Sequence, residues 1–170
     1  MTKSNNMKKI FLTIIISALT IVTFAQSQNI TSSAIIFKQY NSEKDEAKKE
    51  AKIIEAKDYI DLAYENASTS NEPKMWMYRA QIYKIIAFNY SNLDSKAIFK
   101  STESHVQCMQ PHPKKKNTII IYKKWPEQEV FNGLMQCANK LFNLAVESYQ
   151  EGKYQESLDT FLLDKIQPLS

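Results

Sequence analysis

The chain has 170 residues, a length typical of one domain, and its 44% hydrophobic and 24% charged residues are near the globular average. Only two residues are glycine, Gly133 and Gly152, and they lie far apart. A Rossmann fingerprint and a P-loop both need clustered glycines that let the backbone approach phosphate, so both are excluded. The formal net charge is +4, and lysines near the start of the chain supply most of that excess.

The first 25 residues have the pattern of a secretory signal peptide. Three lysines precede an apolar run over residues 10–24, and Ala25 provides a small residue at a cleavage site. This run of 15 residues is shorter than the roughly 20 that a membrane-spanning helix needs. We therefore expect cleavage after Ala25 and export to the periplasm or cell envelope, with an uncleaved membrane anchor as the alternative. The mature chain would carry 19 basic and 18 acidic residues, a net charge of +1 that gives no support for nucleic-acid binding.

The mature chain begins with a polar stretch and continues with helical patterns. Residues 26–42 are weakly patterned, and the sequence predicts a flexible leader there. Residues 43–67 contain no Gly or Pro and repeat apolar residues at steps of three and four, which predicts a long amphipathic helix. Turn-forming residues at 68–73 end it, and we expect Asn71 to cap the next helix, over residues 73–90.

The second half of the chain has an extended insert between two further helical regions. A helix is predicted over 95–109, and prolines at 111 and 113 end it. In the insert, residues 111–126, the run KKKNTIIIYKK (114–124) is β-branched at its centre and predicts a strand or extended loop. Helices are then predicted over 127–151 and 154–166, before a short tail at 168–170. The sequence thus predicts an all-α protein of antiparallel helix pairs.

Two stretches of the chain have the spacing of a helical repeat. Trp76 and Tyr83 match the first-helix pattern W-x2-L-G-x2-Y, with Arg79 in place of the leucine and Ala80 in place of the glycine. The second stretch matches a first helix, a turn and a second helix at Leu144, Ala145, Gly152, Tyr154 and Phe161. A degenerate third unit is marked only by its second helix, around Ala56–Ala63.

In this pattern the chain resembles a tetratricopeptide repeat (TPR) protein of the exported Bacteroidetes type, over residues 43–167. The resemblance implies helix pairs stacked as a short TPR-like α-solenoid whose first helices line a concave groove. It implies a non-catalytic scaffold of the cell envelope that binds a peptide or protein partner in that groove. The residues it places there are Lys74, Met77, Gln81, Lys84, Asn139, Phe142, Val146 and Tyr149. An uncapped C-terminal repeat would also allow self-association. A further hypothesis is that the chain is a part of a longer repeat array.

The insert supports a second hypothesis for function. Lysines at 114–116, 123 and 124 flank the apolar residues TIIIY and Trp125. Such a segment could contact an envelope glycan or a membrane surface, with cations at the rim and apolar residues inserted. The simpler interpretation is a loop that packs its isoleucines on the helices, and the two remain open.

The sequence offers no recognisable catalytic or cofactor site. No nucleophile and base stand in a local catalytic motif, so we expect no enzyme activity and no cofactor. His105, Cys108 and His112 lack the fourth ligand and the paired spacing of a structural zinc site, so no metal is expected. Cys108 and Cys137 could form a disulfide in an exported protein, but two buried free thiols are the favoured interpretation.

Overall fold

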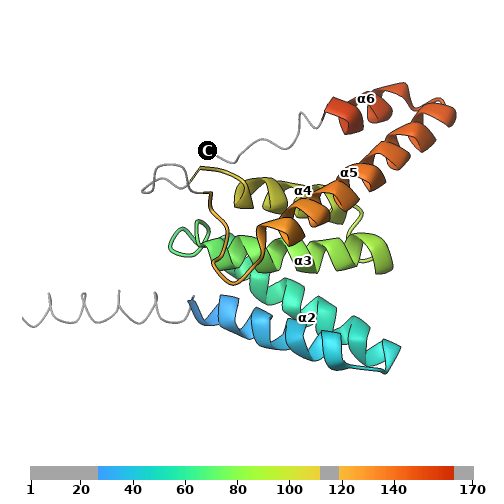
Figure 1. The fold of residues 1–170 in the computed structure, drawn as a ribbon. Helices are drawn as coiled ribbons and strands as arrows, with labels where there is room; N and C mark the ends of the chain where they lie inside the picture. The colour runs from blue at the N-terminus through green and yellow to red at the C-terminus, as the bar shows by residue number, and fades with distance from the viewer. Residues whose placement is uncertain (1–26, 112–118, 163–170) are drawn as a thin grey trace, which may run out of the picture.

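The computed structural model describes residues 27–111 and 119–162, and within these ranges the protein is all-helical (Figure 1). Residues 27–42 form a helix, followed by α2 (Glu46–Tyr64), α3 (Pro73–Asn89), α4 (Ala97–Cys108), α5 (Glu127–Gln150) and α6 (Tyr154–Leu162). The predicted all-α class is therefore confirmed. The predicted signal peptide, its cleavage site and the tail at 168–170 lie outside the described residues.

The prediction of a flexible leader is wrong for residues 27–42, which form a packed helix. Ile30, Ser33, Phe37 and Tyr40 are buried, and their steps of three and four give this helix one apolar face. Ser33 Oγ donates a hydrogen bond to the carbonyl oxygen of Ala56 at 2.8 Å, which holds this helix against α2. The core therefore begins before residue 43.

Helix α2 begins at a residue whose side chain caps it, and the turn after it forms a hydrogen bond back to its last residues. Asp45 is the N-cap, and its carboxylate accepts from the Lys48 backbone N–H at 3.1 Å. The buried residues of α2 repeat at steps of three and four: Ile53, Ala56, Ile60 and Ala63. The Thr69 hydroxyl in the following turn donates to the carbonyl oxygen of Ala63 at 2.6 Å, so this turn packs back onto the helix.

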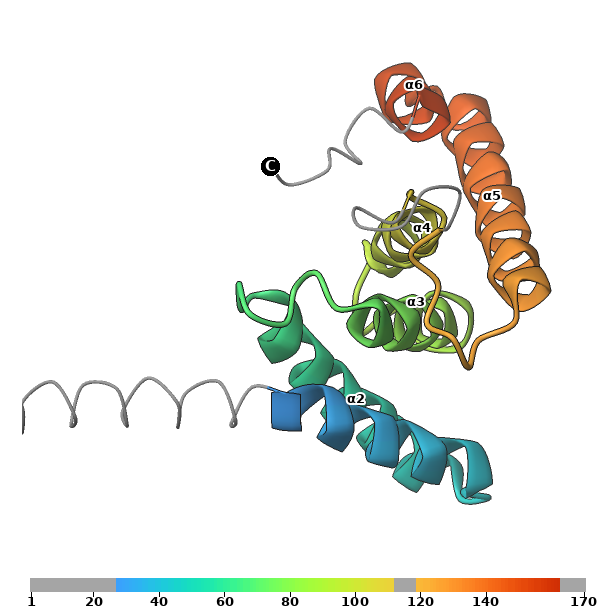
Figure 2. The same cartoon turned by 60° about the vertical axis from the view of Figure 1, so that its left-hand side comes forward.

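Helix α3 lies at the centre of the molecule and contacts α2, α4 and α5 (Figure 2). It begins with Pro73 in its first turn, where the missing N–H costs no hydrogen bond. The predicted cap is wrong by one residue, because Glu72 is the N-cap and makes no side-chain capping bond. Buried residues occur on several sides of α3, including Met75, Trp76 and Ile86, as expected for a helix with neighbours all around it.

The insert is extended where the structure describes it. Pro111 and Ile119 form an isolated antiparallel bridge, and the Ile120 N–H donates to the Gln110 carbonyl oxygen at 2.8 Å. Residues 112–118, including Lys114–Lys116 and the predicted extended run's first half, lie outside the described residues. Trp125 at the end of the insert is 7% exposed, and its ring centroid lies 5.6 Å from that of His105. The insert thus packs on α4 through this tryptophan.

Successive helices form three pairs, namely 27–42 with α2, α3 with α4, and α5 with α6. The predicted turn at Gly152 adopts a φ of 77°, the left-handed conformation that glycine tolerates best. Of the predicted repeat positions, Trp76, Ala80, Tyr83 and Ala145 are buried and Leu144 is partly buried, whereas Tyr154 and Phe161 are 63% and 49% exposed. None of the helices within 27–111 and 119–162 combines the length and apolar content that a bilayer crossing requires.

Candidate functional site

Three of the predicted groove residues, Lys74, Met77 and Gln81, line one hollow of about 490 Å³ beside α3. They lie at steps of three and four on α3, so their side chains leave the same helix face. The opposite wall comes from helix 27–42, through residues that include Phe37 and Lys38. We call this space the α3 hollow.

The end of the insert completes the α3 hollow. Tyr122, Lys124 and Trp125 line it together with Glu129 from the first turn of α5. The burial of Trp125 against His105 fixes the position of this segment. The predicted groove face of α3 and the end of the insert, which the sequence alone suggested as separate sites, therefore meet at one place.

The charges and rings around the α3 hollow determine what it can hold. Lys38, Lys74 and Lys124 line it with one carboxylate, so positive charge exceeds negative charge. Lys74 Nζ lies 6.0 Å from the Tyr78 ring centroid. Burial and the neighbouring Tyr122 raise the pKa of Tyr78, which keeps its hydroxyl neutral near pH 7. Such a surface offers cationic and aromatic contacts to an anionic, partly apolar ligand.

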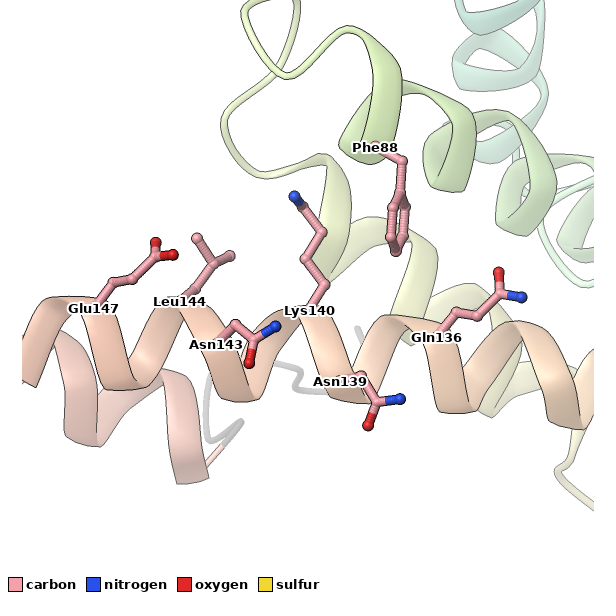
Figure 3. Close-up of a pocket in the computed structure, with 7 residues that line it drawn as sticks. All are labelled: Phe88, Gln136, Asn139, Lys140, Asn143, Leu144 and Glu147. Atoms are coloured by element: carbon pink, nitrogen blue, oxygen red, sulfur yellow. The ribbon is translucent and has the colours of Figure 1, made fainter.

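The predicted groove residues on α5 do not line the α3 hollow. Asn139 lines a separate pocket of about 390 Å³ between α5 and the end of α3, shown in Figure 3. In that view Phe88 and Lys140 extend toward each other from the two helices, with Lys140 Nζ 5.1 Å from the Phe88 ring centroid. This pocket offers few charged or aromatic groups to a ligand, because its remaining lining residues are mostly amides.

The other predicted residues are directed elsewhere. The rings of Phe142 and Tyr149 pair with Phe161 and Tyr154 of α6, at centroid distances of 5.8 and 5.3 Å. Val146 is half-buried and lines neither space, and the Lys84 charge acts on His105, on the α4 side of α3. The eight predicted residues therefore divide among several surfaces, and three of them, Lys74, Met77 and Gln81, line the α3 hollow together.

A buried arginine network joins three helices and was not predicted from the sequence. Arg79 is 3% exposed, and Nη1 donates to Glu103 Oε2 and Ser104 Oγ, each at 2.7 Å. The guanidinium lies 4.0 Å from the Tyr64 ring centroid. The network joins α2, α3 and α4, and the signal that could have revealed it was an arginine on the apolar Trp76–Tyr83 face.

A cluster of Ser101, His105 and Cys137 lies between α4 and α5, and all three side chains are fully buried. His105 Nδ1 donates to the Ser101 carbonyl oxygen at 2.8 Å, so the neutral ring has its lone pair on Nε2, which has no partner. The Ser101 hydroxyl donates to the Ala80 carbonyl oxygen at 2.8 Å, and its oxygen lies 3.4 Å from His105 Nδ1, a nitrogen that carries a proton and so cannot act as a base toward it. Burial lowers the pKa of His105 to about 4. This geometry packs helices together and does not pair a nucleophile with a base.

Cys108 and Cys137 are both free and buried, which agrees with the favoured interpretation of two packed thiols. Burial raises the pKa of Cys108 to about 12 and also raises that of Cys137. Within residues 27–111 and 119–162, no three His, Cys, Asp or Glu side chains are grouped closely enough to hold a metal ion. His112 of the sequence motif lies outside that part of the chain.

Comparison with known proteins gives no match to a family model, to a curated protein or to a solved structure.

Proposed function

We propose that the protein is a non-catalytic interaction scaffold that binds an acidic, partly aromatic peptide segment of a partner protein in the α3 hollow. The observation that carries the proposal is the convergence of Lys74, Met77 and Gln81 with Tyr122 and Lys124 around one open surface hollow of about 490 Å³. The surplus of lysine selects for carboxylates, and the aromatic residues favour an apolar or aromatic side chain between them.

The proposal includes a TPR-like organisation and an envelope location. Helix 27–42 lies against α2, which supports assigning it as the first helix of the degenerate unit, whose first-helix half is poorly marked in the sequence. The contacts between helices that follow one another along the chain also support a stack of three helix pairs. The basic start and apolar run of residues 1–25 support export, so the partner would be another envelope protein.

A peptide-binding assay tests this proposal directly. The probes are labelled octapeptides with four Asp or Glu residues around a central Phe, and matched peptides with Asn and Gln in place of the acids. We expect the acidic peptide to bind more tightly than its amide counterpart. Lys74→Glu with Lys124→Glu should weaken its binding at least about tenfold, because two attractions become repulsions. Raising the salt concentration should weaken it further.

The matched control is Lys140→Glu with Lys153→Glu, which changes the net charge equally but lies outside the α3 hollow. This control should bind the acidic peptide like the wild type. Equal binding of both peptides, or equal loss in both variants, would contradict the proposed site. If neither peptide binds the wild type but an anionic glycan does, the result would instead support the glycan-binding function of the insert.

A further inference from the structure

Exposed apolar side chains in the described part of the chain gather on α5 and α6. Of twelve large apolar side chains that are exposed there, eight belong to these two helices. Among the labelled helices, α6 packs only on α5, and the pair extends from the end of the molecule remote from helix 27–42 (Figures 1 and 2). The α5–α6 hairpin therefore has much less cover than the rest of the fold.

Helix α5 has two apolar faces. One face is buried against the rest of the protein and consists of Val130, Gly133, Cys137, Leu141 and Ala145. The other contains Phe131, Met135 and Phe142, at steps of four and seven, which places them in one stripe along the helix. These three side chains are 48%, 47% and 58% exposed. A solvated helix face would carry charges in these positions.

Helix α6 continues this stripe. Its Phe161 ring packs edge-on against Phe142, with centroids 5.8 Å apart, so the apolar surfaces of the two helices join. Leu158, Phe161 and Leu162 are each about half exposed. We call the joint surface of Phe131, Met135, Phe142, Leu158, Phe161 and Leu162 the hairpin face.

The stripe on α5 is almost free of charge. Between Phe131 and Phe142 the only charged side chain is Lys140, and it is turned to the Phe88 ring on α3. The flanking polar residues are amides such as Asn132 and Asn139. Loss of charge with enrichment in aromatic residues and methionine is typical of the centre of a protein interface. An uncharged surface can also meet its own copy without like-charge repulsion, which a charged one cannot.

We propose that the hairpin face is a self-association surface, on which two copies pair around a two-fold axis near Met135. The two α5–α6 hairpins then pack as a four-helix arrangement. Each of the six side chains exposes about half of a surface of roughly 200 Å². The pair would therefore bury about 1,200 Å² in total before its polar rim is counted, which reaches the lower end of stable specific interfaces.

Sedimentation equilibrium on the full-length chain tests the proposal. We expect a concentration-dependent mass that reaches twice the monomer value. Phe131→Glu with Met135→Glu should raise the dimer dissociation constant at least about 100-fold, because unpaired charges would be buried at the centre of the interface. The matched control, Ile35→Glu with Leu62→Glu, changes side chains that are 53% and 52% exposed on other helices and should leave the dimer intact. Circular dichroism should show equal helix content in both variants.

A charge-exchange experiment identifies the occupant as a second copy. Copies with Glu at positions 131 and 135 should pair with copies that carry Lys at both positions, although neither variant pairs with itself. Only an interface between copies predicts this recovery. A wild type that stays monomeric at 100 μM, which would result if another segment or a different protein covers the face, overturns the proposal. Equal loss in the control variant, or no recovery on mixing, also overturns it.

Discussion

The contact between Gly133 and His105 gives a sharp test of how α4 and α5 pack. A Cβ added at Gly133 would overlap His105 Nε2 and lie 2.9 Å from Cδ2. The ring cannot move aside freely, because Nδ1 donates to the Ser101 carbonyl oxygen at 2.8 Å and Trp125 packs beside it. Glycine is thus required here by the neighbouring ring and not by a special backbone conformation.

The expected effect of Gly133→Ala is the balance of two opposing contributions. Alanine favours the helix by about 1 kcal/mol over glycine. Forcing an extra methyl group into a packed core costs about 1–3 kcal/mol, and displacing the ring loses a hydrogen bond worth about 1 kcal/mol. We therefore expect a net destabilisation of about 1–3 kcal/mol, measured as a fall in the free energy of unfolding in urea.

A double-mutant cycle with His105→Ala isolates the contact. Without the imidazole ring, Gly133→Ala should no longer destabilise and should stabilise by up to about 1 kcal/mol, so its sign reverses. Gly152→Ala is the control, because its φ of 77° disfavours alanine while no atom lies within 4 Å of the added Cβ. Its cost of about 1 kcal/mol should be the same in both backgrounds. If Gly133→Ala has the same effect with and without His105, the proposed contact is refuted.

Three further predictions follow from buried polar groups. Arg79→Met should lower the free energy of unfolding in urea by about 3–5 kcal/mol, because the Glu103 side chain is only 13% exposed and would lose its cation. Adding Glu103→Gln should restore part of this free energy, because it removes the unpaired charge. His105 has a pKa of about 4 when folded and 6.5 when unfolded, so stability should fall by about 3 kcal/mol as pH drops from 6.5 to 4, and His105→Gln should remove that part of the slope. Cys108 and Cys137 should resist a thiol reagent in the native protein and both react in denaturant, and fewer than two reactive thiols there would contradict free cysteines.

The helices could be predicted from the sequence where clear boundaries enclose a regular pattern. Pro73 begins α3 and Gly152 separates α5 from α6, and both act through local backbone preferences. The arginine on the apolar face of α3 was a visible signal, but its partner could not be predicted, because Glu103 lies 24 residues away and only the packing of α3 on α4 brings the two together.

The candidate site was only partly predictable for the same reason. Lys74, Met77 and Gln81 share a face of one helix, so local geometry is enough to place them together. Tyr122 joins them through the path of an irregular segment, which no periodic pattern encodes. Phe142 packs against Phe161 of α6, and this contact depends on how the two helices pack together, which the pattern along one helix does not encode.

The helix over residues 27–42 provides the last test. A flexible leader and a packed core helix would respond differently to mutation. Phe37 is 6% exposed and packs edge-on against Tyr78 of α3 with ring centroids 6.3 Å apart, while Ile35 on the same helix is 53% exposed. Phe37→Ala should therefore cost about 3–5 kcal/mol of unfolding free energy. Ile35→Ala should change it by less than about 0.5 kcal/mol. Equal, small effects of the two substitutions would show that residues 27–42 are not part of the core, and the first helix pair of the proposed repeat array would be lost with them.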